Sequence, residues 1–505
     1  MRTELKNKAS FLFGNETDAN KFPLLNKVIA IYIGITLIFQ ISSLIAPVLT
    51  ALSYTPLYSF KTYFGIIGAG LVAVDLFTNK ALWRGAYCWL LYGIVATAVL
   101  SSLLTFSYGI TDNIFLLCWV VIETALFYSL SYRLDKKAFN RFLFTVYAII
   151  AVIWFIACAI SVAQFIVGKH YVYVVDPLSE DKTISQQGFT ANRLYGIFNP
   201  INHAAYISLM LSLVGIYLSG NIKNKYIKVC NIIAIIFFVL HLVLCVSRSA
   251  IVATFAIIAV ASYLAIRNKL TLPRPRKILT SLICAILIVL VSFGCYTIIK
   301  KGASSVPRLY NSLKHASLSN QGSLPEDPLM LDEEEEELLE RDLKEDSSNG
   351  RIQIWTDYLS LYKDIGLFGF SSGNYMAYIK ENHPDLYIVK YIRETLPTKY
   401  EANIIYHVHN GFIMVFVSTG FVGIILLLIY LIICAVKVVK YIYKNEKISK
   451  EFIVLFSIVI AGCVAACFDR GIFLSDNGQT FIFWIAAGSL MKYISSKKQE
   501  AEAKE

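Results

Sequence analysis

Two histidines stand where a polar segment of the chain meets a long apolar run. His407 and His409 are followed directly by Asn410 and Gly411, and the apolar stretch begins there. Imidazole is the side chain that takes or gives a proton near neutral pH. Most membrane helices begin without histidines, so this pair predicts acid–base chemistry at a membrane surface. Asn410 either positions a neighbouring imidazole or caps the helix that follows, and we favour the cap.

Three arginines add a second kind of chemistry. Arg193 lies in RLYGIFNPINHAAY, Arg248 in SRSA between two apolar runs, and Arg351 in NGRIQIW. A guanidinium stays charged at any working pH and binds phosphate through two parallel hydrogen bonds. Arg248 either snorkels to the membrane interface or binds an anion there. Arg351 begins a predicted helix, where a surface charge and a binding role are equally favoured.

The segment after Arg351 predicts a short amphipathic helix on the membrane surface. Ile352, Trp355 and Leu359 recur there at helical spacing. Trp355, Tyr358 and Tyr362 are then either an interfacial aromatic belt or stacking platforms for sugar rings. The sequence leaves both interpretations open.

Composition indicates the elements that must position these groups. Apolar residues make up 56% of the 505 residues and charged residues 16%, and the mean hydropathy is +0.59. Apolar runs of roughly twenty residues recur, so the fold class is an all-α integral membrane protein with about twelve transmembrane helices. We predict spans near 28–51, 60–78, 86–108, 113–131, 142–167, 201–219, 226–246, 249–266, 278–299, 409–436, 452–468 and 477–494.

The distribution of Lys and Arg predicts the orientation of these spans. Clusters fall in alternate connections, at 2–27, 80–84, 133–141, 223–228, 267–277, 437–450 and 492–504. By the positive-inside rule both termini are cytoplasmic. The chain then divides into helices one to nine over 1–299, a large external loop with short amphipathic helices over 300–408, and helices ten to twelve with a cytoplasmic tail over 409–505.

The remaining composition narrows the function. The formal charge of +11 is spread in short clusters between spans and does not indicate a nucleic-acid partner. The ten cysteines fall in or beside apolar spans, so we expect neither a disulfide framework nor a zinc site. No P-loop or paired acidic motif is present, so we expect no metal and no cofactor. The acidic run at 332–337 is interpreted as a solvated face.

Four motifs in this order resemble one family. They are RLYGIFNPINHAAY at 193–206, SRSA at 247–250, GRIQIWTDY with GLFGFSSGNY at 350–375, and HNGFIMVFVSTGFVG at 409–423. Together with the long loop before the tenth span, they resemble the O-antigen ligase and O-antigen or capsule polymerase superfamily, over roughly 190–425. The resemblance implies a GT-C-like fold. It also implies metal-independent transfer of a glycan from an undecaprenyl diphosphate carrier to an acceptor.

The resemblance also implies roles for the residues above. Arg193 and Arg248 correspond to diphosphate-binding arginines, and His409 to the catalytic histidine. We expect Arg351, Asn410 and His407 to contact substrate. His407 has no counterpart in the motif, which leaves the choice of catalytic imidazole open. In-line attack of an acceptor hydroxyl on the anomeric carbon would invert its configuration, and the arginines would stabilise the leaving diphosphate.

Three functions from different classes follow. The favoured one is a polymerase of lipid-linked repeat units for O-antigen or capsule. The alternative is a ligase whose acceptor is lipid A-core, a wall polymer or a protein. A flippase for lipid-linked sugars is least favoured, because such transporters usually show internal repeats. The expected partners are the lipid-linked donor, a glycan or lipid-linked acceptor, membrane lipid and other polysaccharide assembly proteins. The expected location is the bacterial cytoplasmic membrane.

Overall fold

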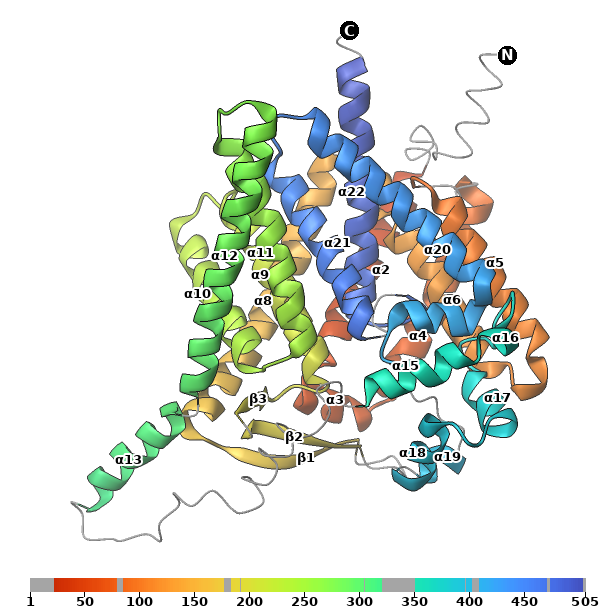
Figure 1. Ribbon diagram of the computed structural model, residues 1–505, viewed down its shortest axis with the longest axis horizontal. Coiled ribbons are helices and arrows are strands. Elements are labelled where there is room, and N and C mark those ends of the chain that lie inside the picture. The colour runs from red at the N-terminus through yellow and green to blue at the C-terminus, as the bar shows by residue number, and fades with distance from the viewer. Residues whose placement is uncertain are drawn as a thin grey trace. The chain divides into compact units, whose positions relative to one another are not determined.

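The computed structural model describes residues 22–79, 85–176, 183–190, 192–303, 305–319, 350–395, 397–401, 408–469 and 473–502. The chain forms two compact units. Unit 1 comprises Met1–Leu37, Ser59–Phe144 and Gly350–Glu505, and unit 2 comprises Ile38–Tyr58 and Thr145–Asn349. Figure 1 labels the helices and strands of both units.

The predicted fold class is confirmed, because the chain is an all-α membrane protein with little sheet. Nine helices among the described residues are long and apolar enough to cross a membrane. The shorter apolar helices Cys88–Leu104 and Asn113–Phe127 cover the third and fourth predicted spans. The first predicted span differs from the structure. Helix α2 (Pro23–Ser42) ends within this span, and a separate helix α3 (Ala46–Ser53) covers its remainder.

Unit 2 consists of long helices and a small sheet. Its helices are α3, most of α8 (Lys136–Val167), α9 (Ile201–Ser219), α10 (Lys225–Leu244), α11 (Arg248–Lys269), α12 (Arg274–Ala303) and α13 (Ser305–Ser319). The antiparallel strands β1 (His170–Asp176), β2 (Thr183–Thr190) and β3 (Arg193–Gly196) follow α8 in the order β1-β2-β3. Tyr171 pairs with Gln187, and Phe189 with Leu194. The sheet lies at one end of these helices (Figure 1).

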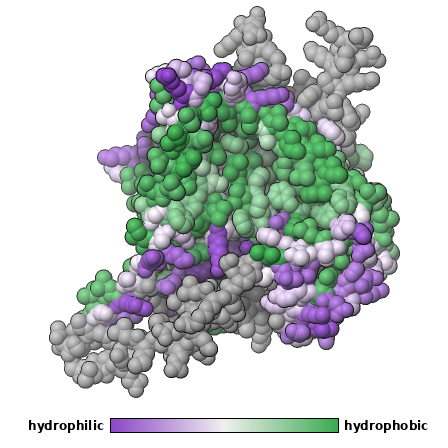
Figure 2. All heavy atoms as spheres, viewed as in Figure 1, coloured by the Kyte–Doolittle hydropathy of each residue, from purple (hydrophilic) through white to green (hydrophobic). Residues whose placement is uncertain are grey.

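The outer face of unit 2 is apolar over most of helix α12. Leu282, Ile286, Leu290 and Val291 are each about half exposed or more. Figure 2 shows a hydrophobic surface over this helix, with hydrophilic residues at its ends. In water such a patch would be costly to expose, so it suits contact with lipid chains.

Unit 1 contains the remaining helices. They are most of α2, then α4 (Phe60–Asn79), α5 (Cys88–Leu104), α6 (Thr111–Ile122), the π-helical turn η3 (Glu123–Phe127), α7 (Leu130–Arg133), α15 (Arg351–Ser360), α16 (Tyr362–Ile365), α17 (Tyr375–Asn382), α18 (Tyr387–Thr395), α19 (Pro397–Glu401), α20 (Gly411–Lys444), α21 (Lys450–Phe468) and α22 (Gly478–Glu502). Helices α15 to α19 gather near one end of α20 (Figure 1).

Helix α20 is interrupted at Gly420, where the backbone adopts φ 65° and ψ −163°. The loop after α16 fills the interruption. Phe370 N donates to Val417 O at 2.8 Å, and Phe421 N donates to Gly366 O at 3.1 Å. Backbone groups freed by the kink are therefore paired, as an apolar environment requires. A side chain at Gly420 would collide with the backbone of this loop.

Helix α15 packs on a core that the sequence interpretation did not identify. Ile354 and Tyr358 are buried, with Tyr358 against Tyr375 and Met376, whereas Ile352 and Leu359 stay exposed. Tyr358 is fully buried. It is therefore neither an interfacial belt residue nor a sugar platform, and both interpretations were wrong for it. Ile352 and Leu359, which defined the predicted apolar face, lie on the exposed side of the helix.

Two further predictions concern cysteines and charges. All ten cysteines are free thiols, and Cys230, Cys295 and Cys467 among them are exposed. Arg133 belongs to a basic cluster in the sequence, yet its guanidinium is buried and pairs with Asp75 at 2.7 Å. The Arg133 charge is thus balanced inside unit 1.

Candidate functional site

Arg193 is held firmly in unit 2. It begins β3, and its Nε donates to the Cys245 carbonyl at 2.9 Å while its Nη2 donates to Asn202 Oδ1 at 2.9 Å. The guanidinium also lies 5.2 Å from the centre of the Tyr195 ring. These contacts fix a permanent positive charge, half exposed, without neutralising it by a carboxylate.

The same contacts bring Arg193 to the turn that carries Arg248. Cys245 ends α10, Val246 has a left-handed φ of 49°, and Arg248 is the first residue of α11. The Arg248 side chain is exposed, while Ser247 and Ser249 on either side are buried. The start of a helix carries partial positive charge and unpaired amides. Unit 2 therefore places two arginines and a helix start around one short turn.

His409 lies in unit 1, directly before α20. Its backbone has a φ of 53°, a left-handed conformation that few residues other than glycine adopt. Such conformations cluster at functional sites when the surroundings hold them in place. The preceding Val408 is buried, and its carbonyl accepts a hydrogen bond from Trp355 Nε1 at 3.0 Å. The His409 side chain is half exposed.

Asn410 is the cap of α20, as the sequence interpretation favoured. Its Oδ1 accepts from Phe412 N at 3.0 Å and from Ile413 N at 3.1 Å. Its Nδ2 donates to the Cys467 carbonyl at the end of α21, at 3.1 Å. The oxygen and the nitrogen of the amide are both hydrogen-bonded, which fixes Asn410 directly after His409. A contact of Asn410 with substrate remains a prediction.

Arg351 is the first residue of α15 and is half exposed. Trp355, one turn further on, makes the bond to Val408 that joins α15 to the segment before α20. Unit 1 thus connects the helix that carries Arg351 with the segment that carries His409. His407 and the acidic run at 332–337 lie outside the described residues, so their predicted roles remain predictions.

Two contributors went unrecognised in the sequence. Asn202, in the first turn of α9, accepts a hydrogen bond from Arg193. An arginine and an amide nine residues apart, across a Pro, were the only signal in the sequence. Glu123 was not singled out at all, although a carboxyl inside an apolar run is by default a candidate functional residue. It is 2% exposed in η3.

These features define a multi-pass helical membrane protein with cationic groups and an imidazole at helix starts. Residues 233–428 match the family model described as O-Antigen ligase. The match supports the resemblance to the O-antigen ligase and polymerase superfamily over these residues. The matched range includes Arg248, Arg351, His409 and Asn410, and Arg193 precedes it. No curated protein matches the chain.

Proposed function

We propose that the chain is a glycosyltransferase that polymerises undecaprenyl-diphosphate-linked repeat units into an O-antigen or capsule. The observation that carries the proposal is the placement of Arg193 on the turn before Arg248. Arg193 is oriented by Cys245 and Asn202, so a diphosphate would meet a fixed guanidinium rather than a mobile one. The family match supports lipid-linked glycan and acceptor substrates in general.

The proposed reaction is a single displacement. The acceptor hydroxyl attacks the anomeric carbon while the bond from that carbon to the diphosphate oxygen breaks, and the electron pair leaves with the diphosphate. His409 takes the hydroxyl proton or orients the hydroxyl. Arg193 and Arg248 stabilise the charge that builds on the leaving group, so the reaction needs no metal. In-line attack inverts the anomeric configuration.

The other predicted residues would complete the site. Arg351 and Asn410 would contact the sugars or the acceptor, and His407 would bind the acceptor from the loop before α20. The Asn410 amide already forms the helix cap and a hydrogen bond to the Cys467 carbonyl. Asn410 would therefore affect substrate binding indirectly, by fixing the position of His409.

A ligase is the second candidate function. The description of the matched family, O-Antigen ligase, favours it. The same donor site would then serve an acceptor such as lipid A-core, a wall polymer or a protein. The two candidates differ only in the acceptor, so one reconstitution separates them.

The test uses the purified full chain in vesicles with a defined undecaprenyl-diphosphate-linked oligosaccharide and EDTA. A ladder of longer lipid-linked glycans from the donor alone supports a polymerase. Product only after addition of lipid A-core, wall polymer or acceptor protein supports a ligase. Absence of transfer in every mixture, with donor binding retained, contradicts both. Loss of transfer that magnesium restores contradicts the metal-independent mechanism.

We also propose that the protein lies in the cytoplasmic membrane with both termini inside. The Asp385 side chain is 94% exposed in the segment before α18, and Glu446 is exposed between α20 and α21. In a cysteine-free background, Asp385→Cys should react with an impermeant thiol reagent in intact cells, because 300–408 would be external. Glu446→Cys should react only after permeabilisation. The reverse pattern would overturn the orientation.

A further inference from the structure

Glu123 is a carboxylic acid buried among apolar helices of unit 1. It opens the π-helical turn η3, which interrupts the run after α6, and it is 2% exposed. Single π-helical turns occur frequently at functional sites. A carboxyl group in such a place costs free energy unless it is neutral or well paired. Its presence therefore requires a physical account.

Two side chains act on the Glu123 carboxyl. The Trp484 indole lines the same cavity and offers its N–H to the carboxyl, and the negative charge of Asp476 acts on the same group. Asp476 itself pairs with Lys61 at 3.0 Å. Glu123 Oε1 is buried without a hydrogen-bond partner in the described structure. A second negative charge beside Asp476 would be repelled, so the neutral carboxylic acid suits this place.

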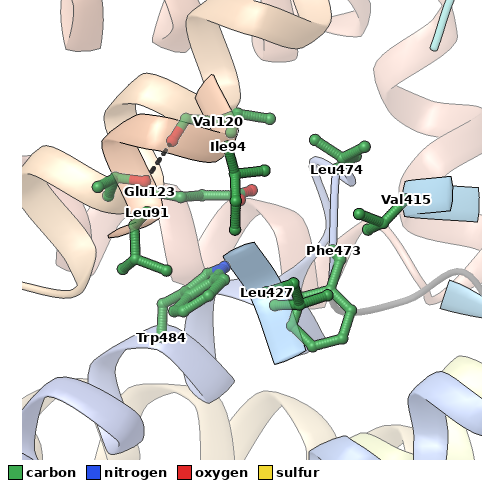
Figure 3. Close-up of a pocket in the computed structure, with 10 residues that line it drawn as sticks. Leu91, Ile94, Val120, Glu123, Val415, Leu427, Phe473, Leu474 and Trp484 are labelled. Carbon is green, nitrogen blue, oxygen red and sulfur yellow. Dashed lines mark hydrogen bonds between the residues drawn. The ribbon is translucent and has the colours of Figure 1, made fainter. Parts of the chain in front are cut away.

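A small cavity adjoins the carboxyl group. It has a volume of about 30 Å³, enough for one water molecule that would satisfy Oε1. Leu91, Ile94 and Trp484 line it together with Glu123, and Val415 and Phe473 lie on the other side (Figure 3). Val415 belongs to the second turn of α20. The cavity thus separates the buried carboxyl from the start of the helix that follows His409.

A continuous series of contacts runs from Glu123 to that helix start. Trp484, which lines the cavity beside Glu123, lies 6.1 Å from Phe473 between ring centres. Phe473 lies 5.5 Å from Phe412. Phe412 N donates to Asn410 Oδ1, which caps α20 directly after His409. Aromatic packing of this kind is rigid and directional, so a shift of Trp484 would be passed to the cap.

We propose that Glu123, as a neutral carboxylic acid, is a positioning residue for His409. It holds the Trp484 indole, Trp484 and Phe473 support Phe412, and Phe412 fixes the start of α20 through the Asn410 cap. The inference rests on the proposed function, in which His409 acts on the acceptor hydroxyl. It assigns no proton transfer to Glu123 itself.

The experiment compares Glu123→Gln, Glu123→Ala and Trp484→Phe in the full-length protein. Gln keeps the acceptor oxygen and the neutral shape, and Ala removes both. Phe keeps an aromatic ring but removes the indole N–H together with the volume of the second ring. Leu126→Ala is the matched control, because Leu126 is buried in the same turn but lies outside the cavity lining. Each variant is assayed for glycan transfer and for the rate at which diethyl pyrocarbonate modifies His409, resolved from His407 by fragment mass spectrometry.

Glu123→Ala and Trp484→Phe should each lower transfer by at least about tenfold, because small misplacements of a catalytic group are costly. Both should also change the His409 modification rate at least about threefold, in the same direction, while Glu123→Gln and Leu126→Ala stay near wild type. An unchanged His409 rate in Glu123→Ala overturns the proposal. If that variant does not fold, an unchanged rate in Trp484→Phe overturns it instead.

Two other outcomes are informative. A Glu123→Gln variant as defective as Glu123→Ala contradicts a neutral positioning role. If the wild-type protein transfers no glycan at all, the proposed function fails. The His409 modification rates would still report whether Glu123 controls the environment of that imidazole.

Discussion

The arginines of unit 2 and the histidine of unit 1 are held by different means. Arg193 is fixed through its own side chain, by hydrogen bonds to Cys245 and Asn202 from two other segments. His409 is fixed through its backbone, which is left-handed between a bonded Val408 and the Asn410 cap. Arg193 is therefore placed by the hydrogen bonds of its own side chain, and His409 by the path of the backbone.

Substitutions at the arginines and substitutions around His409 should therefore reduce activity for different reasons. A permanent charge that is already oriented stabilises a leaving group without reorganisation, so changes at the arginines should act on the chemistry. An imidazole placed by strained backbone depends on its neighbours. Changes around His409, even those that leave the ring intact, should therefore act on its placement.

The largest effect is expected for His409→Ala. Removal of a general acid or base typically costs about 10²- to 10⁴-fold in rate, while the arginines proposed to bind the donor are untouched. Transfer should be lost and binding of the lipid-linked donor kept, measured with purified protein in vesicles. His407→Ala, the neighbouring control, should reduce transfer only partially. An inactive His407→Ala with an active His409→Ala would reverse the assignment, and two active variants would end the histidine mechanism.

The next effect is expected at Arg248. Lysine keeps the charge but not the planar pair of N–H donors, so Arg248→Lys should lose about 10²-fold or more in transfer, nearly as much as Arg248→Ala. Protein yield and melting temperature should not change. Arg276→Lys, at an exposed position at the start of α12, serves as the control and should stay fully active. A fully active Arg248→Lys would leave membrane snorkelling as the sole role of this arginine.

Most of the fold was predictable because runs of apolar residues along the sequence mark the membrane-spanning helices. Each predicted span coincides with a helix or a pair of helices, since a bilayer leaves the backbone few alternatives. The sheet of unit 2 was missed. HYVYVVD at 170–176 has the β-branched and aromatic residues of a strand, and it pairs with the next strand along the chain. The pairing is local, but a search for apolar runs long enough to cross a membrane passes over strands this short.

The candidate site residues could be named from the sequence where the proposed function needs a particular residue type. Arg193, Arg248 and His409 are proposed to act through their side chains, and their motifs were visible. Asn202 and Trp355 contribute through partners 9 and 53 residues away, and no local pattern announces such bonds. The burial of Tyr358 shows the converse case. An aromatic ring in a polar segment can be core, and only packing decides this.

The third prediction concerns stability around α20. Gly420→Ala places a side chain at φ 65° against the loop backbone, and should lower the free energy of unfolding by about 2 to 3 kcal/mol. Gly70→Ala in α4 of the same unit meets open space and should be neutral or stabilising. Thermal unfolding of both variants in detergent tests this. Equal melting temperatures would show that the interruption of α20 does not require glycine.

The smallest effect should come from Asn410, and it tests how His409 is placed. Asn410→Ala removes the cap and should cost about 1 kcal/mol of stability, whereas Asn410→Ser keeps a cap oxygen and should cost only a few tenths. Ser has a single hydroxyl and lacks the separate Nδ2 group that bonds the Cys467 carbonyl in Asn410, so its remaining deficit in stability measures that bond. If the cap is the main role, transfer by Asn410→Ser should stay within about threefold of wild type, because the start of α20 is preserved. An Asn410→Ser protein that melts like wild type but transfers no glycan would mean that the amide itself contacts substrate. The Asn410 side chain would then act on substrate together with His409, as Arg193 and Arg248 are proposed to act together on the diphosphate. The contrast between the two regions would be reduced.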